Sequence, residues 1–190
     1  EPIPIYGYLY HEYVNNFMGN QICAMLEKSE SNFTYRLAYS FTSGDMLTVV
    51  LNGNGDLQYA WCDYIEPKEK CLDKSVVLPF IKTLNEWQRN GGHVFLHFGK
   101  MIAPIRVYCG KEKFLLEDNK TYLHPDSVVT TAYEYGGKRA QFIVNYNLHS
   151  VDIRFDKQYA IYVDSKLQTV VETNKFTLSP LSVVMIDLKE

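Results

Sequence analysis

The strongest constraint on the fold lies in the second half of the sequence, where short runs of alternating apolar and polar residues follow one another without a helical pattern. The runs are 106–110, 128–135, 138–146, 151–155, 159–163, 168–172 and 183–188. Turn-forming residues separate them, and Gly136-Gly137 between two alternating runs is a strong hairpin signal. Short strands at this spacing predict an antiparallel β-sandwich.

The first hundred residues have a different pattern. An aromatic run at 5–10 predicts a strand, and residues 35–42 predict a short helix that Ser43-Gly44-Asp45 ends with a glycine C-cap. The apolar run 46–51 predicts a strand buried on both faces, and the loop 52–56 follows it. Alternation of strand and helix is typical of parallel strands with helical crossovers. We therefore predict an α/β domain over 1–104 and an all-β domain over 105–190, with the boundary near Pro104.

The longest helix is expected over 76–97, where apolar residues recur at intervals of three and four. Trp87 lies on the same stripe as Phe80 and Leu84, so its indole should be buried. Gly91-Gly92 interrupts the stripe at a cost of ~1 kcal/mol per glycine relative to alanine. We expect the helix either to kink at this pair or to let another backbone pack closely against it.

Composition argues against two classes of partner. The 190 residues carry a net charge of −3, and no basic stripe could neutralise a run of phosphates, so we expect no nucleic acid partner. The longest apolar runs are far shorter than the ~20 residues that span a bilayer, so we expect no membrane partner.

Metal and cofactor signatures are missing from the sequence as well. The four cysteines lack metal-ligand spacing, and the disulfide state of Cys62 and Cys71 stays open. His93 and His97 stand four residues apart but have no third ligand at a recognisable spacing, which favours a solvated or capping role. Gly53-Asn54-Gly55 lacks the lysine of a phosphate-binding loop. We expect no cofactor and no metal.

Three parts of the sequence together resemble a known group of proteins: 5–19 with its Tyr10-His11-Glu12-Tyr13 motif, 95–104, and a final block made of 141–146 and 178–186. The chain resembles the C-terminal part of bacterial, largely uncharacterised glycoside-hydrolase-like (β/α)8 barrel proteins that end in a β-sandwich domain. The resemblance implies about two βα units of a barrel followed by the sandwich. A full barrel takes ~250 residues, so the missing N-terminal part of the barrel is an expected partner. The first residue is Glu1 and not Met, which leaves localisation open and compatible with a secreted or periplasmic protein.

The same resemblance and the predicted strand ends indicate a sugar-binding rim. Catalytic groups of barrels lie at the C-terminal ends of strands, which makes Glu12 the catalytic candidate. The predicted substrate-binding residues are Tyr10, His11, Asn52, Asn54, Asp56 and Trp61. Hydrolysis of a glycosidic bond uses two carboxyl groups, and the second would come from Asp56, from Asp63 or from an upstream segment.

Two functions remain open at this point. The first is the C-terminal portion of a glycoside hydrolase, inactive alone, with carbohydrate as its ligand. The alternative is a non-catalytic carbohydrate-binding or structural β module, in which the fifteen tyrosines pack in strands and His11-Glu12 forms a local hydrogen bond or a surface pair.

Overall fold

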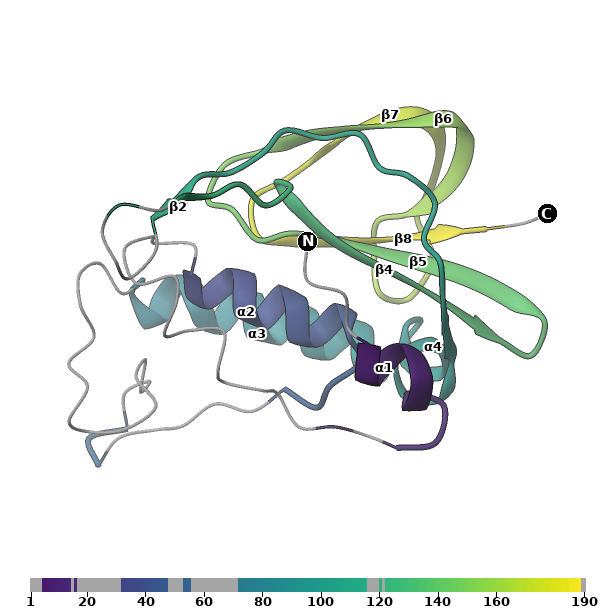
Figure 1. Ribbon diagram of the computed structural model, residues 1–190, viewed down its shortest axis with the longest axis horizontal. Helices are drawn as coiled ribbons and strands as arrows, with labels where there is room; N and C mark the ends of the chain where they lie inside the picture. Colours follow the sequence, from purple (N-terminus) through teal and green to yellow (C-terminus); the bar gives the residue numbers. More distant parts are fainter. Residues whose placement is uncertain are drawn as a thin grey trace.

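In a computed structural model of the chain, the described residues are 5–14, 16, 32–47, 53–55, 72–115, 120 and 122–188. They form three layers (Figure 1): helices on one face, a six-stranded antiparallel sheet, and two strands of that sheet folded over its opposite face. The helices are α1 (Ile5–Tyr10), α2 (Asn32–Thr42), α3 (Lys74–Arg89) and α4 (His93–Phe98). The strands are β1 (Lys100–Ile102), β2 (Phe114–Leu115), β3 (Tyr122–Leu123), β4 (Val128–Tyr135), β5 (Lys138–Asn145), β6 (Val151–Tyr162), β7 (Val170–Leu178) and β8 (Ser182–Asp187).

The sheet has the strand order β1-β4-β5-β8-β6-β7, and β2 pairs with β3 separately. Strand β4 has the predicted bounds, and the predicted hairpin to β5 is confirmed. Gly136 and Gly137 form its turn with φ values of 57° and 75°. Positive φ at both central residues matches the twist of a hairpin, and glycine adopts it without steric cost.

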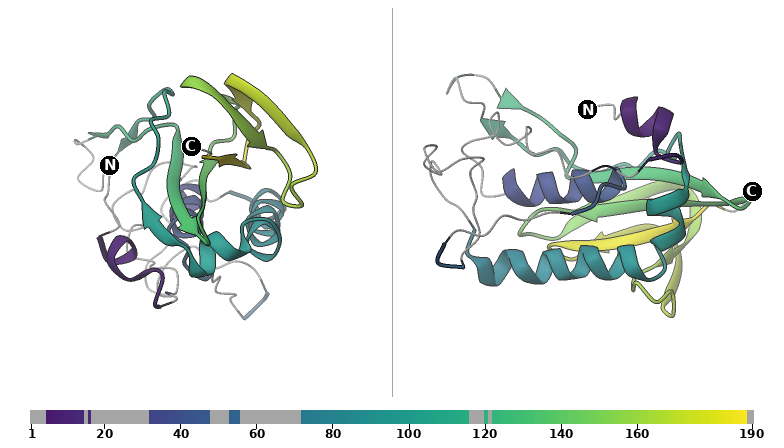
Figure 2. Two further views of the ribbon diagram at one scale, coloured as in Figure 1. Left: turned by 90° about the vertical axis from the view of Figure 1, so that its right-hand side faces the viewer. Right: turned by 90° about the horizontal axis from the view of Figure 1, so that it is seen from below.

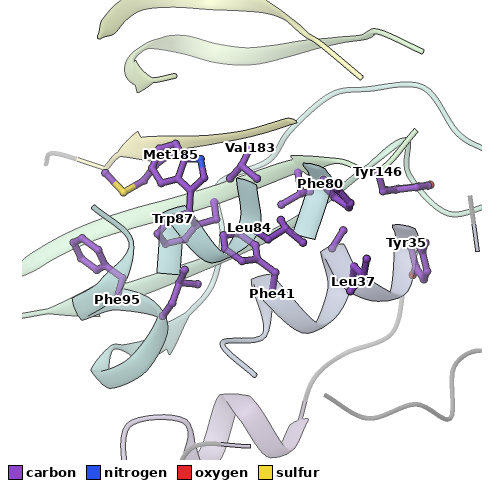
Figure 3. Packing of buried hydrophobic residues seen from close by; sticks show 14 of the residues in the cluster. Tyr35, Leu37, Phe41, Phe80, Leu84, Trp87, Phe95, Tyr146, Val183 and Met185 are labelled. Atoms are coloured by element: carbon purple, nitrogen blue, oxygen red, sulfur yellow. The ribbon is translucent and has the colours of Figure 1, made fainter. Parts of the chain in front are cut away.

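One core joins the helices to the sheet (Figure 3). The buried stripe of α3, formed by Val77, Phe80, Leu84 and Trp87, packs toward strands β5 and β8. Trp87 is 2% exposed, as predicted, and its ring meets Phe142 edge-on at 6.2 Å between centroids. Helices α2 and α3 lie side by side along the same face of the sheet (Figure 2). Because residues from both sides of Pro104 enter this core, the two-domain division stays a prediction.

Glycine residues mark the ends of α2 and α3. After α2, the Gly44 N–H donates to the Phe41 carbonyl and the Asp45 N–H to the Ser40 carbonyl, with Gly44 at φ 76°; this is the Schellman motif, so the predicted C-cap is confirmed. The helix predicted over 76–97 breaks into α3 and α4 at the glycine pair. There the Gly91 N–H donates to the Ser165 carbonyl at 2.7 Å, so the pair both ends the helix and admits a second backbone.

A second core fills the opposite face of the sheet. Strand β6 pairs with β8 only over its last residues, Ala160–Tyr162. Its pairing with β7 has a register shift between Arg154 and Tyr159, and the part of β6 before this shift lies apart from β8. The two strands predicted at 151–155 and 159–163 are therefore one strand with a bulge, which lets β6 and β7 fold over the sheet and enclose apolar side chains. The result is consistent with the expected sandwich. The run 106–110 joins its edge through a bridge between Tyr108 and Arg154.

The strand predicted at 5–10 is wrong, because this segment is helix α1. Almost every position of the run is aromatic or aliphatic, so it carries no period that separates strand from helix. In the helix, Tyr6 and Tyr10 stack one turn apart with ring centroids at 5.1 Å. Of the second predicted strand, 46–51, only Met46 and Leu47 are described; the Met46 N–H donates to the Asn16 carbonyl. The barrel fragment is not shown by the described residues.

Candidate functional site

A cavity opens between the helices and the near edge of the sheet, and we call it the tyrosine cleft. Its volume is about 300 Å³. The lining residues are Tyr8 of α1, Tyr35, Tyr39 and Thr42 of α2, the segment 101–104 at the end of β1, Pro125 and Asp126, and 128–131 at the start of β4. Three tyrosines from two helices thus face one apolar strand surface.

Helix α2 and strand β4 form two walls of the cleft. Tyr35 and Tyr39 are four residues apart and so share one face of the helix. The Tyr35 ring packs edge-on against Tyr146, with centroids 5.0 Å apart, and is buried. On the strand side, the Thr130 hydroxyl donates to the Phe142 carbonyl and accepts from the Gln141 amide, each at 2.8 Å. These two hydrogen bonds fix the Thr130 side chain on the β4 wall of the cleft.

The mouth of the cleft is formed by Tyr8, which is half exposed. Deeper in, burial raises the pKa of Tyr39, and the negative charge of Asp45 raises it further. A hydrogen bond with the Ser43 side chain acts in the opposite direction, and the Tyr39 phenol stays neutral. Burial also raises the pKa of Asp45 to about 6, so this carboxyl titrates close to neutral pH. Burial alone accounts for this value, and Asp45 does not line the cleft.

His11 of the predicted rim is a structural anchor in this fold. Its Nδ1 lies 2.7 Å from the Gly99 carbonyl oxygen and its Nε2 2.9 Å from the Leu96 carbonyl oxygen. The ring is buried and packs on Tyr133 with centroids 4.8 Å apart. Both ring nitrogens are engaged by backbone at the end of α4, so His11 fastens the N-terminal segment to the helical layer.

The other predicted site residues are scattered or undescribed. Glu12 is exposed in the turn after α1, Tyr10 is half exposed, and Asn54 lies in the exposed turn 53–55. None of these three lines the tyrosine cleft. Asn52, Asp56 and Trp61 lie outside the described residues, as does Asp63. The predicted rim stays a prediction, but its premise that Glu12 follows a strand is wrong because α1 is a helix.

The histidine pair of α4 caps a helix. His93 Nδ1 and His97 Nε2 both lie 3.3 Å from the Gln88 carbonyl oxygen, near the end of α3. Burial first and the neighbouring His93 second lower the pKa of His97. Within the described residues, no three His, Cys, Asp or Glu side chains are grouped to hold a metal ion. No described helix is long and apolar enough to span a bilayer.

Two features of the site were missed by sequence reasoning. The first is the cleft itself: the i, i+4 spacing of Tyr35 and Tyr39 on a predicted helix was a signal that they share a face, but not which strand they meet. The second is the influence of Asp45, which does not line the cleft but whose charge raises the pKa of Tyr39; it was interpreted only as part of a helix cap. Its burial comes from tertiary packing, and no pattern in the sequence indicated it.

Comparisons with known proteins give limited guidance. No family model matches the chain, and no curated protein matches its sequence. Among solved structures, the chain is similar to an α-amylase from Geobacillus thermoleovorans, crystallised in complex with acarbose, with 12% identity and a TM-score of 0.42. The match covers 85% of this chain and 34% of that chain, so the chain spans about a third of the amylase. A likeness this weak leaves the family open.

Proposed function

We propose that the chain is the C-terminal portion of a carbohydrate-active enzyme, that it binds a sugar ring in the tyrosine cleft, and that it does not hydrolyse glycosides alone. The observation that supports this proposal is the convergence of Tyr8, Tyr35 and Tyr39 on one cavity of about 300 Å³. The resemblance of the sequence to glycoside-hydrolase-like proteins agrees with it.

The chemistry of the cleft suits a sugar. A pyranose presents an apolar C–H face, which packs on aromatic rings, and hydroxyls, which need donors and acceptors. The lining residues of the cleft include Tyr8, which is half exposed, and Tyr39, whose phenol is neutral. Its volume lies at the lower end of the ~300–1,000 Å³ of small-molecule sites, which favours one ring over an extended chain.

Hydrolysis requires more than these residues supply. Glycosidases use two carboxyl groups roughly 5 to 10 Å apart, one of them with a raised pKa. Asp126 is the carboxyl among the lining residues of the cleft, and it forms an ion pair with Lys111 at 2.9 Å. We propose that the second carboxyl comes from Glu12, from Asp56 or Asp63, or from an upstream part of the enzyme, and that the isolated chain is inactive.

The direct test is ligand-detected NMR with neutral gluco-oligosaccharides on the full chain. Tyr8→Ala removes the ring at the mouth, and Tyr39→Phe removes one hydroxyl while keeping the ring. The matched control is Tyr13→Ala, since Tyr13 is more exposed than Tyr8 and does not line the cleft. We expect saturation transfer to sugar protons to fall by at least ~3-fold in both cleft variants and to persist in the control.

Two results would remove the sugar-binding part of the proposal, and a third would remove the inactivity of the chain alone. If no neutral sugar shows saturation transfer with the wild-type chain, the cleft is not a sugar site. If the Tyr13 control loses transfer as strongly as the Tyr8 variant, the sugars bind elsewhere on the exposed aromatics. Release of nitrophenol from nitrophenyl glycosides by the wild-type chain would show that its catalytic groups are complete.

A structural role is the second candidate, and α1 favours it. Ile5, Tyr6 and Leu9 are each more than half exposed on a six-residue helix, and apolar surface of this density marks contact sites. We propose as the alternative that this helix braces the missing part of the barrel. Ile5→Ser with Leu9→Ser would then abolish association of the chain with a separately produced upstream segment and leave sugar binding in the cleft intact.

A further inference from the structure

A cluster of cations surrounds one tyrosine beside the folded-over part of the sheet, and none of its residues lines the tyrosine cleft. The Arg106 guanidinium carbon lies 4.7 Å from the centroid of the Tyr108 ring, and that of Arg154 lies 4.9 Å from it. The segment that carries Tyr108 runs beside β6 (Figure 1) and bridges it at Arg154. Two guanidinium groups therefore converge on a single aromatic ring.

The cluster continues onto the next strand. In the register of β6 and β7, Arg154 stands directly opposite Lys175. A shallow depression lies there, and its lining includes Tyr108, Arg154, Lys175 and, at one side, Asp152 and Thr177. Tyr108, Arg154 and Lys175 thus form one row across three neighbouring chain segments, and Arg106 extends the positive charge.

The cations of this row are not neutralised by ion pairs among the described residues. Within the described residues, no carboxylate forms an ion pair with Arg106, Arg154 or Lys175. The Asp152 carboxylate at the border accepts a hydrogen bond from the Thr177 hydroxyl at 2.6 Å. Stacking on Tyr108 accounts for the position of the two guanidiniums. It does not account for Lys175, since like charges directly opposite on neighbouring strands destabilise a sheet.

We propose that this cluster binds the oxyanion groups, carboxylate or sulfate, of an acidic polysaccharide. Guanidinium groups present planar forks of N–H donors that match such groups, and stacking on Tyr108 holds two forks in place before the ligand arrives. An anion bound between Arg154 and Lys175 attracts both side chains and offsets the repulsion between them. Strand β7 ends the sheet, so a polymer can cross the row and continue past the edge, where successive sugars present further charges.

The test is affinity electrophoresis of the full chain in native gels that contain polygalacturonate, dextran sulfate, neutral dextran or poly-L-glutamate. The chain has a net charge of −3, so retardation by a polyanion requires a local basic site. The test variant is Arg106→Gln with Arg154→Gln. The control, Arg89→Gln with Lys138→Gln, removes two positive charges from exposed positions outside the cluster.

We expect polygalacturonate, dextran sulfate or both to retard the wild type and the control, and the test variant to bind at least ~10-fold more weakly. Which polymer retards the chain identifies carboxylate or sulfate as the ligand group. Arg154→Lys keeps the charge but loses the fork, so a folded Arg154→Lys protein should also bind more weakly, even if the double variant is unstable. Neutral dextran should have no effect.

Three outcomes would overturn the inference. The first is no retardation of the wild type by either acidic polysaccharide. The second is an equal loss in the charge-matched control, which would reveal an effect of net charge. The third is retardation by poly-L-glutamate as strong as by polygalacturonate, which would assign the cluster to acidic peptides. None of these depends on neutral sugars in the tyrosine cleft, so the two proposals fail separately.

Discussion

Asp45→Asn should make the protein more stable at neutral pH. Burial raises the pKa of this carboxyl from 3.8 to about 6, a difference of about 2, which corresponds to roughly 3 kcal/mol at 1.36 kcal/mol per pKa unit. The side chain keeps part of its exposure, and solvent screening reduces the expected value to ~1–2 kcal/mol. Asparagine keeps the backbone contacts of Asp45. The N–H donates to the Ser40 carbonyl, and the carbonyl accepts from the Gln88 side-chain amide.

The raised pKa of Asp45 determines how its contribution to the free energy of unfolding changes with pH. Between pH ~4 and ~6 the unfolded carboxyl is ionised while the folded one holds its proton, so the folded state binds more protons and stability falls as pH rises. The stability that protonated Asp45 contributes is fully present below pH 3.8, is lost through pH ~6 and is gone above it. Other carboxyls, such as Asp73 and Asp164 with lowered pKa values, act in the opposite sense. The quantity to measure is therefore the difference between variant and wild type.

Urea denaturation of both proteins at half-unit steps from pH 4 to 7.5 measures this difference. We expect the variant to match the wild type near pH 4 and to exceed it by ~1–2 kcal/mol at pH 7.5. Asp156→Asn, at an exposed position on β6, is the control and should give a flat difference. A flat difference for Asp45→Asn as well would refute the reasoning, because it would mean that the folded state does not desolvate this carboxyl.

Three further substitutions test the packing. Trp87→Ala should lower the free energy of unfolding by ~3–5 kcal/mol, measured by urea denaturation; a loss below ~1 kcal/mol would contradict the observed burial. Gly92→Ala places a Cβ 2.7 Å from the Trp87 carbonyl oxygen and should cost ~1–3 kcal/mol, whereas Gly53→Ala, with nothing within 4 Å, should have little effect in the same assay. His11→Ala removes the ring that contacts the Leu96 and Gly99 carbonyls; a buried carbonyl that loses its donor costs ~1–3 kcal/mol. The substitution should also speed proteolysis within 5–14, and unchanged cleavage would show that other contacts hold α1.

The elements that the sequence predicted correctly are those with local signals. Strands β4 and β5 alternate and meet at a two-glycine turn, which sets both the register and the hairpin. Helix α3 carries a stripe at a period of 3.6, and its break coincides with Gly91-Gly92. In both cases residues close together in the sequence determine the element, and the contacts with distant parts of the chain are compatible with it.

The segment 5–14 shows why the rest was not predictable. Its aromatic run is compatible with strand or helix, and the deciding contacts come from a distant part of the chain. His11 bonds to carbonyls 85 and 88 residues away. The tyrosine cleft has the same origin, since Tyr35 of α2 and Thr130 of β4 both line it and are almost a hundred residues apart in the sequence. The burial that shifts the pKa of Asp45 is likewise a property of the assembled layers.

The division into 1–104 and 105–190 can be decided by producing the second segment alone. The core between β6, β7 and the rest of the sheet is built wholly from described residues after Pro104, which argues that the segment retains its sheet. The opposite face would lose its helices and expose buried side chains that now meet them: Tyr133, Phe142, Tyr146, Val183 and Met185. Exposed apolar surface of this kind binds hydrophobic dyes and promotes association.

We therefore expect 105–190 to show a sheet signal in circular dichroism, to bind an anilinonaphthalene dye that the full chain does not bind, and to unfold at a lower urea concentration. Phe142→Ser in the segment separates the two cores, because Phe142 contacts Phe41, Trp87 and Phe95 of the helical layer. In the segment it should lower dye binding at little cost in stability, whereas in the full chain it should destabilise by several kcal/mol. A segment without sheet signal would mean that the helices are required for the sheet to form and that the chain is one folding unit. A segment as stable as the full chain, with no dye binding, would mean that the helix-facing core contributes little.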